Sequence, residues 1–503
     1  MVSTAKSPIP PPVSFSVTQI CEQLIEIEKE LSLFTWSIDG IYIWPLFRMS
    51  IYYELTRKLG VFGAPHGTSK WKGRRWRRIY LWLYAVSSTF FTKRTPKDIL
   101  IFEHARKVKK NGYWVDIYSE SLIEELKKSS FTFTVYENLS NQSMTHQGRR
   151  CPHQYIDPIL TWSGLLAHLF PIRLSPKDQH KIQEVEQEIE RIFQVKVSLQ
   201  KRIAKRVREF TIAKKSFTKL LRAQRPKKVV LVVSYSHSMS PLIAAAKEEQ
   251  IETIELQHGT FSPYHLGYHF PNNERVPYFC DTFFSFGPFW HKMAMLPLPD
   301  SAIKAYGFEH LNEQLHSAES TTTKDSILFL SQGVIGEGLA KYVCVCAQAK
   351  VAYPLIYKLH PSEYTTWRIN YPELADCHDQ GLIQVIDHHD LKLYDLMRQA
   401  LCQVGVFSTA IYEGLALGCR TLLVDLPGLE YMQALIEKGY ADKIETPEQL
   451  CQYLLNLSLV HSPQEQESTF EMQNLPENKS IQADQIFCSV QQGALDYLFL
   501  DKD

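Results

Sequence analysis

Residues 227–259 read KKVVLVVSYSHSMSPLIAAAKEEQIETIELQHG, and this stretch decides the fold. It opens with the run Val229–Ser234, which is rich in β-branched residues and lacks polar alternation, as expected of a strand covered on both faces. A helix is expected over Pro241–Gln250 and a second strand over Ile251–Leu256. The stretch therefore predicts a strand–helix–strand unit that ends at the turn Gln257-His258-Gly259.

The same alternation continues on both sides of this unit. Toward the N-terminus, Asp98–Glu103 has the pattern of a buried strand that feeds a polar loop. Toward the C-terminus, further strands are expected at 327–331, 354–359, 382–386, 402–407 and 421–424, with helices between them. Such alternation predicts an α/β protein with mainly parallel sheets covered by helices on both faces.

Changes in composition divide the chain into parts. Its 503 residues are enough for two or three domains. The expected order is a mainly helical N-terminal extension (1–96), an N-terminal Rossmann-like domain (97–310) with a long helical insert (177–219), a Ser/Thr-rich linker (311–325), a C-terminal Rossmann-like nucleotide-binding domain (326–461), and a polar segment with a last helix (462–503).

Charge and cysteine usage exclude several classes of protein. Lys and Arg total 55 against 54 Asp and Glu, so no global basic field indicates a nucleic-acid partner. The ten cysteines lack the spacing of a zinc site, and we expect neither a metal nor a cofactor. No signal peptide is predicted at the N-terminus, so the expected location is the cytoplasm.

The stretch Trp71–Phe91 indicates contact with a membrane surface. Five basic residues between positions 72 and 78 precede the apolar run Ile79–Phe91, which is shorter than the roughly 18–20 residues needed to span a bilayer. Basic and aromatic residues in this order are typical of peripheral binding to an anionic inner membrane. A core helix with a solvated basic start is the alternative.

Polar residues follow the expected strands of the C-terminal half, where ligands bind in parallel α/β sheets. Ser408 and Thr409 stand at a strand-to-helix junction, which favours a phosphate at the helix start, and Glu413 follows one turn later to accept from a ribose hydroxyl. Ser408 as a simple N-cap is the alternative. The other candidate nucleotide-binding residues are Ser331, Gln332, Gly333, Lys358 and Pro361, and His360 is a candidate to hold or protonate a departing phosphate.

The N-terminal half supplies the candidate base and acceptor residues. His258 stands in a glycine-containing turn and has the ring chemistry of a general base. Gln257, Arg106, Lys110 and Asp116 are candidates to line a groove for an anionic glycan acceptor, although a solvated basic loop explains the last three equally well.

These residues resemble a known family. The Gln-His-Gly turn at 257–259, the His-Pro pair at 360–361 and the hydroxyl pair at 408–409 are similar to motifs of bacterial GT-B glycosyltransferases that build capsule and lipopolysaccharide, in particular the sialyl-, polysialyl- and Kdo-transferases. The resemblance implies two Rossmann-like domains facing across a cleft, a CMP-activated sugar donor, and phosphate contacts from His360, Ser408 and Thr409. Those families carry an acidic residue where this chain has His258.

The expected function is therefore metal-independent transfer of a sugar, CMP-activated sialic acid or a Kdo-like sugar first of all, to a surface polysaccharide or a lipid-linked glycan. Three alternatives remain at this point: a glycerophosphotransferase that uses CDP-glycerol, a nucleotide-sugar epimerase, and a non-catalytic scaffold of a polysaccharide assembly complex.

Overall fold

The computed structural model describes residues 15–62, 83, 86, 94–110, 112–138, 153–272, 274–316, 324–388, 392–460 and 483–499. Two segments singled out from the sequence lie outside these residues. They are the basic and aromatic stretch Trp71–Phe91, of which only Leu83 and Val86 are described, and the polar segment at 462–482. No helix of the described residues combines the length and apolar character needed to cross a membrane.

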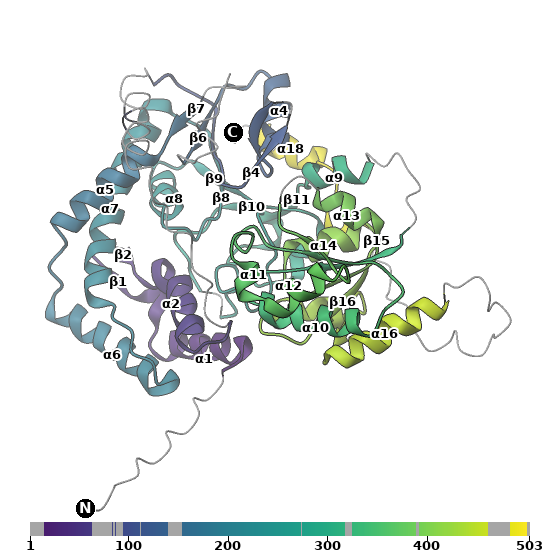
Figure 1. Ribbon diagram of the computed structural model, residues 1–503. Coiled ribbons are helices and arrows are strands. Elements are labelled where there is room, and N and C mark those ends of the chain that lie inside the picture. The colour runs from purple at the N-terminus through teal and green to yellow at the C-terminus, as the bar shows by residue number, and fades with distance from the viewer. Residues whose placement is uncertain are drawn as a thin grey trace, which may run out of the picture.

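The N-terminal domain is built on a seven-stranded parallel sheet (Figure 1). Its strand order is β11-β10-β9-β8-β3-β6-β7, so the chain starts in the middle, winds to one edge and then to the other. The strands are β3 (Ile99–Phe102), β6 (Phe133–Glu137), β7 (His153–Tyr155), β8 (Lys228–Val232), β9 (Glu252–Leu256), β10 (Thr282–Ser285) and β11 (Ile303–Ala305). The covering helices are α4 (Glu120–Lys128), α5 (Asp157–Leu169), α7 (Gln200–Gln224) and α8 (Met239–Glu248), with short 3₁₀ turns η2 (Pro288–Lys292) and η3 (Asp300–Ala302).

The C-terminal domain repeats this winding in a six-stranded parallel sheet. Its order is β14-β13-β12-β15-β16-β17. The strands are β12 (Ser326–Leu330), β13 (Leu355–Lys358), β14 (Gln384–Ile386), β15 (Ala400–Gly405), β16 (Arg420–Val424) and β17 (Asp442–Ile444). The helices are α10 (Gly336–Gln348), α11 (Trp367–Asn370), α12 (Pro372–Asp379), α13 (Leu393–Gln399), α14 (Thr409–Ala416), α15 (Gln433–Glu437) and α16 (Pro447–Val460), with the 3₁₀ turn η4 (Leu429–Met432).

When the strands are numbered from the first of each domain, both sheets have the strand order 3-2-1-4-5-6 of a Rossmann fold. The N-terminal sheet has one more strand, β11, at its edge. The expected α/β architecture of the GT-B type, with two Rossmann-like domains, is therefore confirmed. In such sheets the order reverses beside the first strand, and a crevice opens there at the carboxyl ends. The two crevices lie between β3 and β8 and between β12 and β15.

The N-terminal extension is a compact unit with its own small hairpin. It consists of α1 (Val17–Glu30), the 3₁₀ turn η1 (Leu33–Thr35), β1 (Ser37–Ile38), β2 (Ile41–Tyr42) and α2 (Trp44–Lys58). Ser16 caps α1 through a capping box with Gln19. The charged stretch at 177–219 forms two helices, α6 (Pro176–Phe193) and α7, whose apolar residues such as Ile189 and Val207 are buried within the chain. Figure 1 shows α1, α2 and α6 grouped on one side of the N-terminal domain.

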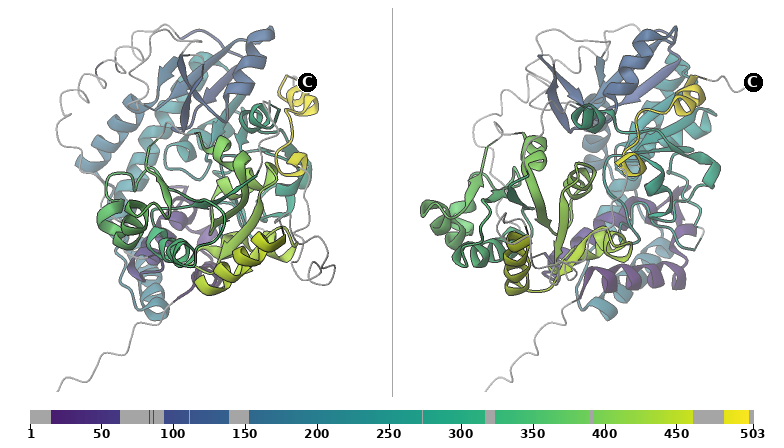
Figure 2. Two further views of the ribbon diagram at one scale, coloured as in Figure 1. Left: turned by 45° about the vertical axis from the view of Figure 1, so that its right-hand side comes forward. Right: turned by 90° about the vertical axis from the view of Figure 1, so that its right-hand side faces the viewer.

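The last helices return to the N-terminal domain (Figure 2). These are α17 (Ala483–Ile486) and α18 (Gln492–Phe499). The Cys488 amide donates to Phe286 O, and the Phe308 amide donates to Cys488 O. Gly307, at φ +117°, passes so close that a Cβ would lie 2.6 Å from Cys488 O. The chain thus crosses twice between the domains.

Two local features differ from the expectations. The helix α9 (Glu309–His316) occupies the first residues of the segment expected to be a linker, because Leu311 is buried and Leu315 packs against the core. A hairpin of β4 (Lys107–Lys110) and β5 (Tyr113–Asp116) follows β3 in the loop that carries Arg106.

Candidate functional site

The polar turns of the two domains meet at their facing crevices. A Cβ placed on Gly259, in the turn after β9, would lie 3.8 Å from Thr409 Oγ1 at the start of α14. Near this contact the rings of Trp290 and Tyr412 pack with centroids 4.7 Å apart, one from each domain. The turn at 257–259 and the helix start at 408–409, singled out separately from sequence, are therefore brought together.

His258 is the end of a buried hydrogen-bond chain. Tyr268 Oη donates to Glu255 Oε1 (2.5 Å) and lies 3.0 Å from His258 Nδ1. When Glu255 is ionised, the phenol gives its one proton to the carboxylate, and His258 Nδ1 carries the proton of the second bond. Burial raises the pKa of Glu255, so this arrangement belongs to the pH range above that pKa. This pattern assigns an unprotonated Nε2 to His258, which is the form required of a base.

Burial lowers the pKa of His258 well below its usual value, and His104, His265 and Arg106 lower it further. The ring is therefore neutral at physiological pH. Gln257 holds the turn in place: its Nε2 donates to Gly259 O (2.8 Å), and its Oε1 accepts from the Phe286 amide (2.8 Å). Gln257 is buried, so both ends of its amide are used inside the protein.

The loop after β3 carries Arg106 into the space between the domains. The Arg106 amide donates to His104 Nδ1 (3.1 Å), and its Nη1 donates to Tyr118 Oη (3.2 Å). Burial lowers the pKa of Arg106, but Tyr118 and Glu413 raise it by more than burial lowers it. The net change is upward, so the guanidinium stays charged. Arg106 thus acts electrostatically on the C-terminal domain from its place in the N-terminal domain.

Asp116 supports this loop from beneath. Its carboxylate accepts from the amides of His104 (2.7 Å) and Tyr118 (3.0 Å), and it is fully buried. Burial raises the pKa of Asp116 to about 7, with a smaller contribution from Glu103. The side chain is enclosed and does not face the space between the domains.

The start of α14 has the geometry expected from its sequence. Ser408 is the N-cap in extended backbone, and its Oγ accepts from the Ala410 amide (3.2 Å). Glu413 is 1% exposed, and its Oε2 has no hydrogen-bond partner among the described residues. Burial raises the pKa of Glu413, while Arg106 and a hydrogen bond from Tyr394 lower it. This oxygen of Glu413 can therefore still accept a hydrogen bond.

His360 has the opposite proton arrangement to His258. The Ser362 amide donates to His360 Nδ1 (3.2 Å), and Ser362 Oγ lies 2.7 Å from the same nitrogen. An amide can only donate, so Nδ1 is the acceptor and the proton lies on Nε2. Burial lowers the pKa of His360, Glu363 raises it, and Arg106 and Lys358 lower it. The exposed ring of His360 therefore presents an N–H donor.

Pro361 follows in a turn that runs to Thr366, and the next helix, α11, begins only at Trp367. The turn forms because Glu363 Oε2 accepts from the His360 amide (2.7 Å) and folds the chain back.

Glu363 links this turn to the loop after β12. Its Oε1 accepts from Ser331 Oγ (2.9 Å) and from Tyr371 Oη (2.6 Å). Gly333 is needed beside it, since a Cβ there would lie 2.7 Å from Ser362 Oγ. Ser331 therefore uses its hydroxyl within the protein, while Gln332 is half-buried on the same loop.

Two predicted lysines have partners of their own. Lys358 Nζ donates to Tyr364 Oη (2.6 Å) and to His388 O (3.0 Å), and burial lowers its pKa. Lys110 Nζ pairs with Glu313 of α9 (2.5 Å). These contacts engage both amines with residues other than those of the turn that carries His258.

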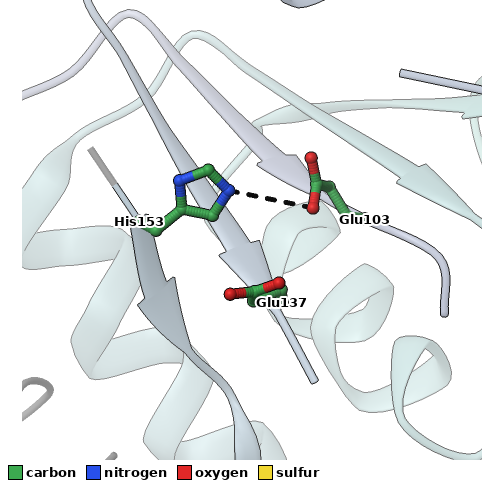
Figure 3. A group of neighbouring side chains, drawn as sticks. All are labelled: Glu103, Glu137 and His153. Carbon is green, nitrogen blue, oxygen red and sulfur yellow. Dashed lines mark ion pairs between the residues drawn. The ribbon is translucent and has the colours of Figure 1, made fainter. Parts of the chain in front are cut away.

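A cluster of Glu103, Glu137 and His153 lies at the carboxyl ends of β3 and β6 and the start of β7 (Figure 3). Its ligand atoms lie within 4.8 Å of one another, as in a metal site. The cluster already holds a cation, because Lys107 Nζ donates to Glu103 Oε2 (2.8 Å) and to Glu137 Oε2. Glu103 and Glu137 raise the pKa of Lys107 against the effect of burial, so the amine stays charged.

Several residues around the site were not found from sequence. Tyr268 and Glu255 orient His258, Glu363 orients His360, and Tyr394 contacts Glu413. Glu255 lies inside a strand and Tyr268 in an aromatic loop. For Glu255 and Tyr268, the sequence indicates a role only through their closeness to the Gln-His-Gly turn. For Tyr394, no sequence pattern indicates a role.

No protein-family model and no curated protein matches the sequence. Among solved structures the chain is similar to UDP-GlcNAc 2-epimerase from Neisseria meningitidis, at 14% identity and a TM-score of 0.46, covering 80% of this chain and 99% of that chain. UDP-GlcNAc 2-epimerase from Methanocaldococcus jannaschii gives 9% identity and a TM-score of 0.45, covering 80% and 99%. MurG from Acinetobacter baumannii gives 12% and 0.37, covering 72% and 91%. Sequence identities and TM-scores this low do not indicate a function, which must be argued from the residues of the site.

Proposed function

We propose that the chain is a glycosyltransferase that moves a sugar from a nucleotide donor, with a CMP-activated sialic acid or Kdo-like sugar as the first candidate, to a surface glycan. The observation that carries the proposal is the approach of the Gln257-His258-Gly259 turn to the helix start at Ser408 and Thr409, where a Cβ placed on Gly259 would lie 3.8 Å from Thr409 Oγ1. Each of the two crevices is where a Rossmann fold binds ligands.

In this proposal the C-terminal domain holds the donor. The N-terminal end of α14 attracts the phosphate, because the helix dipole is positive there. His360 Nε2–H donates to the same phosphate, and Glu413 Oε2 accepts from a ribose hydroxyl. Gln332, Gly333 and Pro361 border the nucleotide, while Ser331 and Lys358 act through the contacts they make within the domain.

The N-terminal domain activates the acceptor. His258 Nε2 takes the proton of the acceptor hydroxyl as its oxygen bonds to the sugar carbon, while the bond between that carbon and the phosphate oxygen breaks. The phosphate leaves with the electron pair of that bond. Arg106, His360 and α14 stabilise the charge that develops on it. No metal ion is needed for this step, because these groups supply the positive potential.

The depressed pKa of His258 suits this order of events. A neutral ring is ready to accept a proton, but a strongly depressed pKa makes a weak base. Binding an anionic donor next to the ring raises that pKa, since a nearby negative charge favours the imidazolium. The base therefore becomes effective when the donor is in place. Gln257 and Asp116 position the two loops, and Lys110 fixes α9 beside them.

The test is a binding titration of the purified chain with CMP, CDP, UDP and GDP. We expect selective binding of CMP that His360→Ala weakens by about tenfold, the equivalent of one hydrogen bond to a charged group. His180, an exposed residue of α6, provides the matched control His180→Ala, which leaves affinity unchanged.

Other outcomes identify other functions. Preference for CDP with turnover of CDP-glycerol means glycerophosphate transfer. Conversion of a UDP-sugar to an isomer without any acceptor means an epimerase. A chain that binds no nucleotide refutes the proposal and is a scaffold.

A further inference from the structure

A cavity of about 390 Å³ lies where the N-terminal extension meets both domains. Met49, Tyr53 and Phe62 line it from α2 and the turn that follows, and Tyr264 lines it from the loop after β9. Val334 and Phe407 line it from the C-terminal domain. Its size is within the range of small-molecule sites, and its walls are mainly aromatic and aliphatic.

The cavity is lined by residues next to those of the proposed active site. Three of them, Thr260, Val334 and Phe407, directly adjoin Gly259, Gly333 and Ser408 in the chain. On the loop side, His265 packs on Tyr235 (centroids 5.5 Å apart), and Tyr235 packs on His258 (6.2 Å). His265 in the cavity wall is thus linked to the proposed base through a single ring.

The walls are held open by contacts between the extension and the C-terminal domain. Tyr52 Oη of α2 hydrogen-bonds to Tyr431 Oη, and the rings of Phe62 and Phe407 lie 5.8 Å apart. Large apolar side chains nevertheless remain exposed at this place: Tyr53 is 56% exposed and Val334 is 41% exposed. Contiguous apolar surface of this kind marks a binding site.

The lining of the cavity includes a cation, Arg57. Glu54, three residues before it, is already paired with Lys58 and Arg202. No carboxylate among the described residues pairs with Arg57. An apolar chain with an anionic head matches both the apolar walls and this cation.

We infer that this cavity binds the apolar chain of a lipid-phosphate-linked acceptor, with Arg57 at its phosphate. The inference rests on the proposed function. If that function is correct, the glycan acceptor is attached to a lipid phosphate, and the lipid is bound near His258. The inference also agrees with the chain's sequence after Phe62, where basic and aromatic residues predict contact with an anionic membrane surface.

Farnesyl phosphate is the probe, because it is an apolar chain with one phosphate. Equilibrium binding to the full chain is measured by fluorescence, in parallel with farnesol and inorganic phosphate. We expect farnesyl phosphate to bind, farnesol to bind about tenfold more weakly, and phosphate alone not to compete.

Two variants test the location. Tyr53→Asp puts a charge on the apolar wall and weakens farnesyl phosphate by about tenfold or more. Arg57→Gln weakens farnesyl phosphate but leaves farnesol unchanged. The matched control is Trp162→Asp on α5, since Trp162 is 53% exposed and does not line the cavity.

The outcomes separate this inference from the proposed function. Loss of probe binding in Tyr53→Asp with CMP affinity retained supports the cavity. Unchanged probe affinity in Tyr53→Asp, or no binding to the wild-type chain, overturns it whether or not CMP binds. Displacement of the probe by phosphatidylglycerol vesicles also overturns it, because the occupant is then a bulk membrane lipid. Probe binding as expected in a chain that binds no nucleotide refutes the glycosyltransferase alone.

Discussion

The hydrogen bond at one ring nitrogen decides what the other nitrogen of a cleft histidine can do. At His258 the partner of Nδ1 is Tyr268, whose proton is given to Glu255, so Nε2 is the acceptor. At His360 the partner of Nδ1 is the Ser362 amide, so Nε2 is the donor. The two rings thus present opposite groups, a nitrogen acceptor on the N-terminal side and an N–H donor on the C-terminal side.

Tyr268→Phe tests the chain of bonds behind His258. It removes the hydroxyl that holds the ring, so we expect transfer to slow by about tenfold, the equivalent of one hydrogen bond. CMP affinity stays the same, because the C-terminal domain is untouched. A role limited to packing predicts no change in the pH profile of transfer. Positioning predicts that the acidic limb of that profile shifts, because the pKa of the base His258 sets that limb and the Tyr268 hydroxyl no longer fixes its proton to Nδ1.

Lys107→Met tests the buried cluster of Figure 3. The Lys107 side chain is 2% exposed and bonds to Glu103 and Glu137, which are buried as well. Removing the amine leaves two buried carboxylates without their cation, so the free energy of unfolding falls by about 3–5 kcal/mol. Lys109→Met, two residues along the same hairpin and exposed, changes it by no more than about 0.5 kcal/mol. Urea denaturation measures both, and equal effects would contradict the role given to Lys107.

At the scale of elements, the N-terminal extension is attached to the loop that follows the proposed base. Arg48 of α2 forms a two-bond pair with Glu28 of α1, and its Nη1 donates to Leu266 O and His269 O (2.7 Å). The guanidinium also lies 4.7 Å from the centre of the Phe270 ring. Because Arg48 is almost fully buried, these bonds replace the water that would otherwise surround its charge.

Arg48→Met should therefore loosen both elements together. The free energy of unfolding falls by about 3–5 kcal/mol, since Glu28 is left buried without its cation. Adding Glu28→Met recovers part of the loss by removing that carboxyl group. Limited proteolysis is expected to cleave the loop at 259–272 sooner in the single variant than in the double variant. Equal cleavage in wild type and Arg48→Met would mean that Arg48 does not hold the loop.

The elements that could be predicted from sequence are those whose burial is visible in the sequence itself. The runs at β8 and β12 are mainly apolar or β-branched without alternation because both faces are covered, and these strands form where expected. The strand β4 has the sequence KVKK, and its Lys107 is buried only through a pairing with Glu137 made in the folded chain. No local pattern contains that information.

The same distinction applies to the site. His258, His360, Ser408 and Glu413 were found because they stand at or near strand ends, where a parallel sheet exposes its ligand groups. Asp116 and Gln257 are near the same places, yet the structure encloses them, since their polar atoms are used by backbone amides and carbonyls. Position along a strand predicts proximity to the site, and only packing decides which side chains remain available.

At the scale of the whole molecule, the junction of the two domains contains neutral histidines beside a fixed cation. His104 follows β3, and His310 begins α9, where its ring lies 5.8 Å from that of Tyr394 of the C-terminal domain. Burial, together with a smaller effect of Arg106, lowers the pKa of each histidine from 6.5 to about 4. Protonating either ring adds a positive charge next to the guanidinium.

Acidification should therefore weaken this junction. Between about pH 4 and 6.5 the unfolded chain binds these two protons and the folded chain does not, so their contribution to the free energy of unfolding rises with pH and is lost as pH falls. The double variant His104→Gln, His310→Gln removes both titrations. We expect the wild-type chain to lose more stability than the double variant when urea denaturation is compared at pH 7.0 and about pH 4.5. Parallel losses in the two chains would contradict the assignment, because they would mean that both rings titrate alike in the folded and unfolded states.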